Sequence, residues 1–554
     1  MADLLLTSIE YSGYISPLKF IVFLVLFLAW LPLTDWVYRD ARAVGTKEVL
    51  WAAIIFGTGA AATMIWLITP VFIIGTLLYL IAVGTTSVSY VIHRNTKVAE
   101  YNRLLTAEHI KSLFVSEAKS LDTLKKLLFI TANNNEVPIP QPKTPDFLSY
   151  KAAYDVFTDA TWRRASDIIL SPTQQDYGIT YYIDGIASKQ PAIPRENVER
   201  FIRFLKNLAD MDPDEKRKPQ KGKFKIQKDT KYTGWEAITA GSTAGEQVQI
   251  KQITQQEMGK LTDIGLTTDQ YEQLNMVCEA KRGLFIVAGV PKSGVTTTLY
   301  AMLRKHDPYL FSINTLEREP SAELTNITQN VFTLSDTGTT TYAKKLQSVI
   351  RMGSDIVGVA DCADNETAQT ACWAAKSGKV VYVTLEAENV IQALGKWIKL
   401  IGDRSVIAET LLGISNQRLL RKLCNECKEA YEPNKELLKK FNIPAEKTKV
   451  FYRAPKERHD KHGKPIICGS CQGTGFVGRI CVFELITIND ELRRVIQQSK
   501  SLSEIGTEFR RAKMLYLQEQ AMKKVIDGTT AINEMVRVLS SEKKQKTETT
   551  EEKA

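Results

Sequence analysis

The sequence predicts an α/β protein attached to helices that cross a membrane. Three observations support this prediction. Long apolar runs crowd into the first hundred residues, strand and helix patterns alternate over most of the remaining chain, and two Cys-x-x-Cys pairs stand in its last third. At 554 residues the chain is too long for one compact core, so we expect several domains.

Three apolar runs near the N-terminus are each long enough to cross a bilayer as a helix. We expect spans at about 18–38, 49–68 and 71–92, after an N-terminal tail of residues 1–17. The first run lacks the basic flank and the small-residue cleavage site of a signal peptide, so an anchor is predicted. Two spans with a re-entrant piece are the alternative.

Positive residues beside these runs predict their orientation. Arg39, Arg42 and Lys47 lie between the first two runs, and Arg94 and Lys97 follow the third. Cytoplasmic loops carry the excess of Lys and Arg, so both of these sides are cytoplasmic. With three spans, the N-terminus lies outside and everything after Arg94 lies in the cytoplasm. We therefore expect a multi-pass protein of the inner, or cytoplasmic, membrane, with the lipid bilayer as a partner.

A helical segment and a proline-rich linker are expected between the membrane and the folded domains. Apolar residues recur at spacings of three and four from 95 to about 135, and residues 133–145 hold four prolines. A smaller N-terminal α/β domain is expected over 146–260. Within it, ITYYIDG at 179–185 predicts a strand that enters a turn, and 196–211 predicts an amphipathic helix.

A larger α/β domain, expected over 265–540, begins with a strand, a glycine turn and a helix. GLFIVAG is a short apolar strand and TTTLYAMLRKH a helix, which is the order in a phosphate-binding loop. In the pattern G-x-x-x-x-G-K-[ST], backbone N–H groups wrap the phosphates, and the hydroxyl residue binds magnesium. The expected nucleotide-binding positions are Gly289, Ser293, Gly294, Val295, Thr296 and Thr297.

The lysine of this pattern is missing. Val295 stands at its position and supplies no charge, so phosphoryl transfer loses a major electrostatic contribution. Lys292, three residues earlier, is the candidate substitute. The alternative is a loop that keeps its turn because the strand-to-helix connection needs it, with nothing bound.

Residues from about 160 to 530 resemble the ATPases of type II secretion and type IV pilus assembly. RRASDIILSP and YYIDGIA look like the paired signature of the family's N-terminal domain, and NTLEREP resembles its acidic box. DIVGVADCADNETAQTACWAAKSGKVVYVTLEAEN resembles its Walker B segment and the histidine box that follows. The resemblance implies a RecA-like P-loop NTPase core, ATP and magnesium as cofactors, and a hexamer.

Several catalytic positions of this resemblance are changed. Asp361 stands at the Walker B glutamate position with a side chain one methylene shorter, Ala363 replaces an arginine, and Glu386 replaces the histidine of its box. Arg351 is kept, and Glu317 matches the acidic-box glutamate. Each change affects a charged position that should bind phosphate or orient the attacking water. Weak or absent ATP hydrolysis is therefore predicted.

Three further positions lie beside these. Gln347 stands where the family tends to carry an arginine, Asp355 is kept, and Arg318 with an extra residue disturbs the acidic box. Nucleotide binding without turnover stays open, because Thr296 and the backbone N–H groups survive and a helix N-terminus attracts phosphate by itself.

The strongest local signal is a pair of Cys-x-x-Cys motifs about forty residues apart, expected in an element over 420–485. Four thiolates can bind one tetrahedral zinc, and a site closed by four sulfurs is structural. The expected ligands are Cys424, Cys427, Cys468 and Cys471. The segment GTGFVGRICVFELI resembles the zinc-bearing element of the same ATPases, which in that family holds a protrusion used in assembly contacts.

Two remaining parts of the composition are less specific. The other cysteines stand among apolar neighbours and predict small buried side chains in a reducing compartment; they are Cys278, Cys362, Cys372 and Cys481. The charged tail 541–554 has no apolar periodicity and is predicted to be disordered.

Taken together, these patterns predict a membrane-anchored pseudo-ATPase: a scaffold or regulatory subunit, in a hexamer or in a mixed ring with an active paralogue, that contacts secretion or pilus platform proteins. The alternative is an atypical active ATPase that powers such a machine. Transmembrane helices depart from the family, whose motors are peripheral, so its usual recruitment partner is in doubt.

No nucleic-acid partner is predicted. The net charge is +10, but Lys and Arg are mixed with acids rather than gathered in one block. The basic stretch 216–228 could meet phosphates, acidic lipid or a partner, or form a solvated surface. A nucleic-acid translocase would share the RecA-like core but neither the four-cysteine element nor the N-terminal signature.

Overall fold

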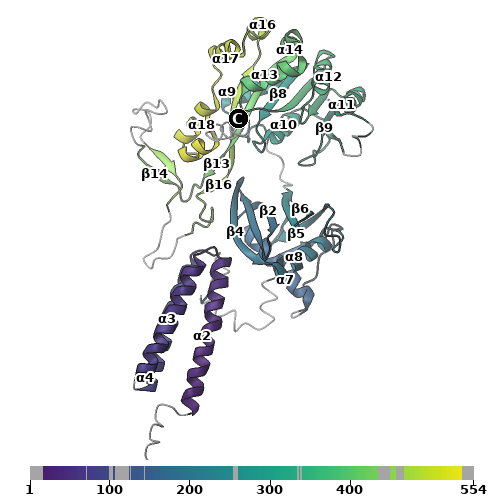
Figure 1. Cartoon of the computed structure of the whole chain (residues 1–554). Coiled ribbons are helices and arrows are strands. Elements are labelled where there is room, and N and C mark those ends of the chain that lie inside the picture. The colour runs from purple at the N-terminus through teal and green to yellow at the C-terminus, as the bar shows by residue number, and fades with distance from the viewer. Residues whose placement is uncertain are drawn as a thin grey trace, which may run out of the picture. The chain divides into compact units, whose positions relative to one another are not determined.

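A computed structural model shows two compact units, which divide the chain between Gln252 and Ile253 (Figure 1). The structure describes residues 17–69, 71–98, 104–105, 124, 126–141, 144–253, 260–333, 336, 338, 340–433, 450–456 and 467–539.

The first unit contains three long N-terminal helices and an antiparallel sheet. Its helices are α2 (Pro17–Ala43), α3 (Glu48–Ile68), α4 (Phe72–Asn95), α7 (Pro145–Trp162) and α8 (Arg195–Leu208). Its strands are β1 (Leu127–Ile130), β2 (Ala165–Pro172), β3 (Asp176–Ile183), β4 (Ile186–Pro194), β5 (Gln220–Lys228), β6 (Lys231–Ser242) and β7 (Gly245–Ile253).

Helices α2, α3 and α4 are long and apolar enough to cross a membrane, over Lys19–Arg42, Glu48–Ile68 and Phe72–Asn95. Small residues let them approach closely: a Cβ on Gly59 would lie 2.1 Å from Trp30 Nε1, which donates to the carbonyl oxygen of Ile55 at 3.2 Å. The predicted spans therefore coincide with three packed helices. Pro70, in the predicted join, lies outside the described residues.

The sheet of the first unit has the order β1-β5-β6-β7-β2-β3-β4. The predicted strand at 179–185 is confirmed: β3 and β4 form a hairpin whose turn residues Asp184 and Gly185 have φ values of 49° and 84°, as a type I′ turn requires. The predicted amphipathic helix is α8. It packs with α7 on a core that contains the rings of Phe157, Phe201 and Trp235.

The predicted helix from 95 to about 135 is wrong near its C-terminal end. Residues 127–130 form β1, which pairs antiparallel with β5 and buries Phe129 completely. A short apolar run such as LLFI is compatible with a helix and with a strand, and its pairing with β5 makes it a strand. Val137, within the predicted linker, packs on the same core, so the folded unit begins before residue 146. Residues 106–123, where most of that helix was predicted, lie outside the described residues.

The second unit is built on a mainly parallel sheet. Its helices are α9 (Thr268–Cys278), α10 (Val295–Leu303), α11 (Tyr342–Arg351), α12 (Asn365–Lys376), α13 (Val390–Ile401), α14 (Arg404–Thr410), α16 (Asp490–Gln498), α17 (Leu502–Arg511) and α18 (Leu517–Ile526). Its strands are β8 (Gly283–Gly289), β9 (Ile313–Glu317), β10 (Thr328–Val331), β11 (Ile356–Val359), β12 (Val380–Glu386), β13 (Leu411–Leu423), β14 (Glu429–Tyr431), β15 (Phe451–Arg453) and β16 (Phe476–Thr487).

The sheet order is β10-β9-β11-β12-β8-β13-β16, and all neighbours are parallel except β13 and β16. Strand β8 is apolar on both faces. Leu284 and Ile286 face a core shared with α11, α12 and α13, whereas Phe285 and Val287 face a core shared with α9 and α10. Helices on both faces are what a parallel sheet requires. The predicted strand and helix around the glycine turn are thus confirmed as β8 and α10.

The four scattered cysteines, Cys278, Cys362, Cys372 and Cys481, are all buried, as predicted. The predicted disordered tail 541–554 lies outside the described residues.

Candidate functional site

The turn between β8 and α10 lies at the carboxyl edge of the parallel sheet. The N–H of Ser293 donates to the carbonyl oxygen of Val290 at 3.1 Å, and Lys292 and Gly294 have φ values of 64° and 87°. A Cβ on Gly289 would lie 2.2 Å from Ser293 Oγ. Both glycines of the predicted pattern are therefore required by the structure. Gly289 permits the close approach of Ser293, and Gly294 adopts a left-handed backbone conformation.

The first turn of α10 has the features of an anion site. No side chain caps its N-terminal N–H groups, whereas Thr267 caps α9 and Thr341 caps α11. Ser293 is 4% exposed, and its Oγ has no hydrogen-bond partner among the described residues. Uncapped N–H groups beside a buried, unpaired hydroxyl can bind a phosphate oxygen.

Val295, at the lysine position, turns toward the protein interior. It is half-buried and packs on the core that contains Phe285 and Leu299. The predicted phosphate-binding positions Thr296 and Thr297, in the same helical turn, are half-buried as well. Lys292 is exposed at the turn, and its role as a substitute cation stays a prediction.

Strand β13 braces the loop from the side, a feature that the sequence analysis missed. Gln417 Nε2 donates to the carbonyl oxygen of Ser293 at 2.9 Å, while Gln417 Oε1 is buried and has no partner among the described residues. Asn416 Nδ2 donates to the carbonyl oxygen of Ala387 at 2.9 Å. The available signal was the polar run Ser415 to Gln417 within an apolar strand, because buried amides need partners.

Glu386, at the histidine-box position, stands beside the loop. It ends β12, lies opposite Gly289 in the strand register, and is exposed. The N–H of Ala387 donates to the carbonyl oxygen of Gly289 at 3.2 Å. A carboxylate beside a phosphate site would repel the phosphate, so the predicted effect of Glu386 is the same as that of the missing lysine.

Asp361, at the Walker B position, follows β11, which β12 separates from β8. Its φ of 55° is left-handed, and its N–H donates to Thr384 Oγ1 at 2.7 Å. Its side chain is exposed at the carboxyl edge of the sheet. A left-handed non-glycine residue costs about 1 to 3 kcal/mol and persists only where its surroundings hold it.

Glu317, in the acidic box, is engaged inside the protein. It is 2% exposed and accepts hydrogen bonds from Tyr300 Oη at 2.5 Å, Thr315 Oγ1 at 2.7 Å and Gln329 Nε2 at 3.3 Å. Burial and the bond to Glu317 raise the pKa of Tyr300, which therefore stays a neutral donor. Three bonds occupy the carboxylate, which leaves little capacity to orient an attacking water.

The structure does not bring Arg351 to the loop. Helix α11 starts at the carboxyl edge, where Tyr342 Oη lies 2.6 Å from the carbonyl oxygens of Leu316 and Ala360. It ends at Arg351 near the amino edge, where Asp355 Oδ2 accepts from the N–H of Ser312 at 2.9 Å.

The predicted metal ligands are close together. The sulfurs of Cys424, Cys427, Cys468 and Cys471 all lie within 4.8 Å of one another, and the pairs 424–468 and 427–471 are 3.8 and 3.6 Å apart. Bonds of about 2.3 Å set the sulfurs of a tetrahedral zinc site about 3.8 Å apart, so the four cysteines fit this metal. The N–H of Gly475 also points to Cys471 Sγ at 3.3 Å, as in a second coordination sphere.

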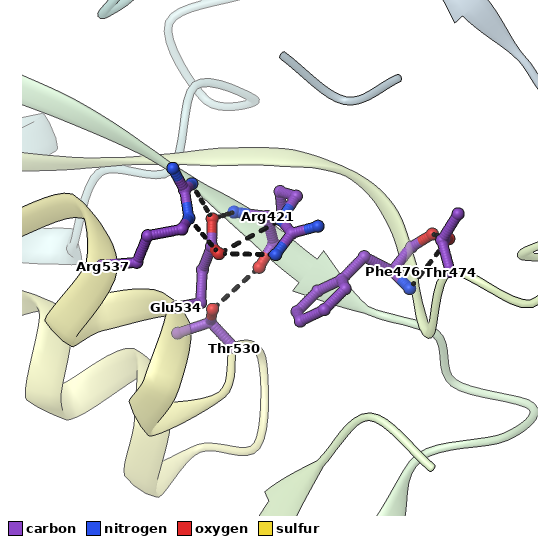
Figure 2. Close-up of polar contacts among 6 residues, drawn as sticks. All are labelled: Arg421, Thr474, Phe476, Thr530, Glu534 and Arg537. Carbon is purple, nitrogen blue, oxygen red and sulfur yellow. Dashed lines mark hydrogen bonds and ion pairs between the residues drawn. The ribbon is translucent and has the colours of Figure 1, made fainter. Parts of the chain in front are cut away.

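An ion-pair cluster around the buried Glu534 joins this element to the helical residues 532–539 (Figure 2). Glu534, 2% exposed, accepts from Arg421 Nη2 at 2.8 Å and from Arg537 Nη2 at 2.6 Å. Burial raises the pKa of Glu534, but hydrogen bonds from Arg537 and Arg421 outweigh it and hold the pKa at about 2. The Arg421 guanidinium also lies 3.9 Å from the ring centroid of Phe476.

Known proteins share most of this architecture. A family model described as type II/IV secretion system protein matches residues 148–537. The chain is 26% identical to the type IV pilus assembly ATPase PilB of Thermus thermophilus, over 72% of this chain and 44% of PilB. It is 28% identical to the type II secretion system ATPase E of Vibrio cholerae, over 68% of this chain and 72% of that protein. The chain thus spans less than half the length of PilB.

Among solved structures, the ATPase DotB of Legionella pneumophila has a TM-score of 0.50 at 15% identity, over 73% of this chain and 97% of DotB. This similarity is one of fold alone. Helices α2, α3 and α4 lie outside the segment that the family model matches.

Proposed function

Since the chain belongs to the type II/IV secretion system protein family, we propose that it is a membrane-anchored, ATPase-like subunit of a secretion or pilus-assembly machine. It binds nucleotide phosphate at the turn between β8 and α10 and hydrolyses it little or not at all. Its role is then that of a scaffold or regulator in a hexamer or mixed ring with a paralogous active ATPase, on the cytoplasmic side of the inner membrane.

The main support for weak or absent hydrolysis is the set of charged and neutral side chains around the loop. Val295 is neutral and packs inward, Glu386 is an acid opposite Gly289, and Glu317 is held by three hydrogen bonds. Loss of one group that stabilises the transition state costs about 100- to 1000-fold in rate. Several such changes together favour a protein that no longer turns over ATP.

Binding of phosphate is supported by what the loop keeps. The first turn of α10 has no side-chain cap, and the buried Ser293 Oγ has no partner among the described residues, so an anion would satisfy both. Thr296 would supply the hydroxyl ligand of a bound magnesium. The four cysteines would hold a structural zinc, which has no open position for water.

The alternative, an atypical active ATPase, is favoured by Lys292. This lysine is exposed within the same turn, at a left-handed position three residues before Val295. Its ammonium group would replace the missing cation, with Asp361 as the residue that orients water.

The test measures ATP binding and turnover by the full chain in lipid nanodiscs, with and without magnesium. Val295→Lys restores the charge at the position that the loop pattern uses, and Val290→Lys is the matched control in the same loop. We expect no turnover in the wild type, and nucleotide affinity about tenfold higher for V295K only.

Magnesium-dependent turnover in the wild type that disappears in Lys292→Ala would overturn the scaffold proposal and establish the atypical ATPase. Equal gains in affinity for V295K and V290K would show that the loop attracts nucleotide by general charge and does not form a phosphate cradle.

A further inference from the structure

The amino edge of the parallel sheet lies at the opposite end of the strands from the candidate phosphate site. Backbone hydrogen bonds join the turns that enter four adjacent strands. The N–H of Gly283 donates to the carbonyl oxygen of Lys379, that of Val380 to Asp355, and that of Asp355 to Ser312, at 3.0, 3.1 and 2.9 Å. The segments before β8, β12, β11 and β9 therefore form one continuous edge.

A turn on this edge carries three exposed apolar side chains, which we name the apolar tip: Tyr309, Leu310 and Phe311. Their exposed fractions are 86%, 75% and 43%. Asp307 organises the turn, since its Oδ1 accepts from the N–H of Tyr309 at 2.9 Å and its carbonyl oxygen accepts from the N–H of Phe311 at 3.0 Å. Side chains this exposed have few neighbours, so the tip is a protrusion and not the wall of a groove.

The base of the tip is held by the core. His306 Nε2 lies 2.7 Å from Oη of the fully buried Tyr382, and the rings of His306 and Phe311 contact edge to face at 6.2 Å between centroids. Strand β12, which carries Tyr382, is central in the sheet. The tip is thus presented on a rigid base, which lowers the entropic cost of binding.

Exposed cations lie on the same edge, and we name them the basic ring: Arg282, Arg304, Lys305 and Arg351. Arg282 precedes β8, Arg304 and Lys305 follow α10, and Arg351 ends α11.

The acids Asp307, Asp355 and Glu279 lie on this edge and keep their negative charge. Asp307 and Asp355 accept backbone N–H groups, and Glu279 accepts from Asn275 Nδ2 at 2.6 Å. The four cations of the basic ring, together with the exposed Lys281 that precedes Arg282, outnumber these three carboxylates, so the edge carries a net positive charge beside the apolar tip.

We propose that this edge docks on an anionic bilayer surface, with the apolar tip in the headgroup layer and the basic ring on lipid phosphates. Charge complementarity selects anionic lipid, and aromatic and aliphatic side chains beside Lys and Arg favour the membrane interface. A peptide ligand would need a groove, which the exposure of Tyr309 and Leu310 argues against. The docking rests on the proposed anchoring, because α2, α3 and α4 would keep a bilayer within reach.

The test places a photoreactive benzoylphenylalanine at position 310 of the full chain in nanodiscs. We expect lipid adducts about fivefold more abundant in discs that contain phosphatidylserine than in discs of phosphatidylcholine alone. The charge-reversed variant with Arg304→Glu and Lys305→Glu should lose this difference, and added salt should reduce it. Thermal melting checks that each variant is folded.

The matched control places the probe at Tyr516, which is 43% exposed and lies beside Arg510, an arginine paired with Glu519. Adducts there should not depend on lipid charge. Crosslinks from position 310 to a second copy of the chain, or no lipid adduct in discs that retain the chain, would overturn the docking. A chain that does not co-elute with the discs would instead refute the anchoring, and the docking with it.

Discussion

The loop at the start of α10 and the four-cysteine element belong to the same unit, yet their polar groups are satisfied to very different degrees. At the loop, Ser293 Oγ and Gln417 Oε1 are buried without a partner among the described residues, and Val295 stands where the pattern needs a cation. At the cysteine element, four sulfurs converge and Glu534 is bonded by two arginines.

This difference supports the proposals that the loop binds a phosphate ligand and that the four cysteines hold one metal ion. Buried polar atoms without partners cost stability, while a closed set of ligands contributes it. The cysteine element should therefore govern the stability of the unit's C-terminal part, and the loop should govern what the unit binds.

The largest expected effect is that of metal removal. A strong chelator should unfold β14, β15 and the adjacent ends of β13 and β16, since structural zinc contributes about 10 kcal/mol in small zinc domains. Hydrogen exchange should rise in these segments and in 528–537, which contact them through Leu423 N and Thr529 O at 2.8 Å. Exchange at 289–296 should not change, and a uniform rise over both regions would break the comparison.

The next effect is that of Glu534→Gln, which removes the buried charge that pairs with the half-buried Arg421 and the exposed Arg537. We expect a loss of about 2 to 3 kcal/mol in the free energy of unfolding by urea, because charge-assisted hydrogen bonds are lost while both guanidinium groups stay accessible to water. Because the pKa of about 2 in the folded protein lies below the ordinary value of 4.5, this stability is present above about pH 4.5 and is lost as the pH falls toward 2.

The variant E534Q should therefore also flatten the acid limb of the stability curve. Glu272→Gln, an exposed carboxyl on α9, is the control and should change neither quantity. If the stability of E534Q depends on acidic pH as that of the wild type does, the ion pair does not hold the helical residues 532–539 on the four-cysteine element.

A smaller effect is expected from Gly289→Ala, because the added Cβ would lie 2.2 Å from Ser293 Oγ and 2.8 Å from Val295 Cγ2. Overpacking of this kind costs about 1 to 3 kcal/mol. Gly178→Ala in β3, where the nearest atom would be 3.8 Å away, is the control. A cost in G289A no greater than in G178A would mean that the loop is not closely packed.

The smallest effect separates the two kinds of buried hydroxyl. Ser293→Ala removes an Oγ without a partner among the described residues and should raise stability by about 1 kcal/mol while weakening phosphate binding. Ser354→Ala, which removes a donor to the carbonyl oxygen of Val349 at 2.7 Å, should lower stability by a similar amount. If differential scanning calorimetry shows that both variants change stability in the same direction, Ser293 is not a buried hydroxyl that only a ligand can pair.

Local residue spacing was sufficient to predict three parts of the protein. The apolar runs predicted α2, α3 and α4, the order of strand, glycine turn and helix predicted β8 and α10, and two Cys-x-x-Cys motifs predicted the four clustered sulfurs. Each of these patterns is local in the chain or, for the paired Cys-x-x-Cys motifs, depends on a residue type whose spacing is specific to metal binding.

Contacts between residues far apart in the chain became known from the folded structure and could not be predicted from spacing. The folded structure made 127–130 a strand beside β5, tied Glu317 to Tyr300, carried Arg351 to the amino edge, and placed Gln417 against Ser293, 124 residues away in the chain. The physical reason is that a side chain's charge and shape reveal what it can bind, whereas the pairing of strands determines which groups come within hydrogen-bond distance.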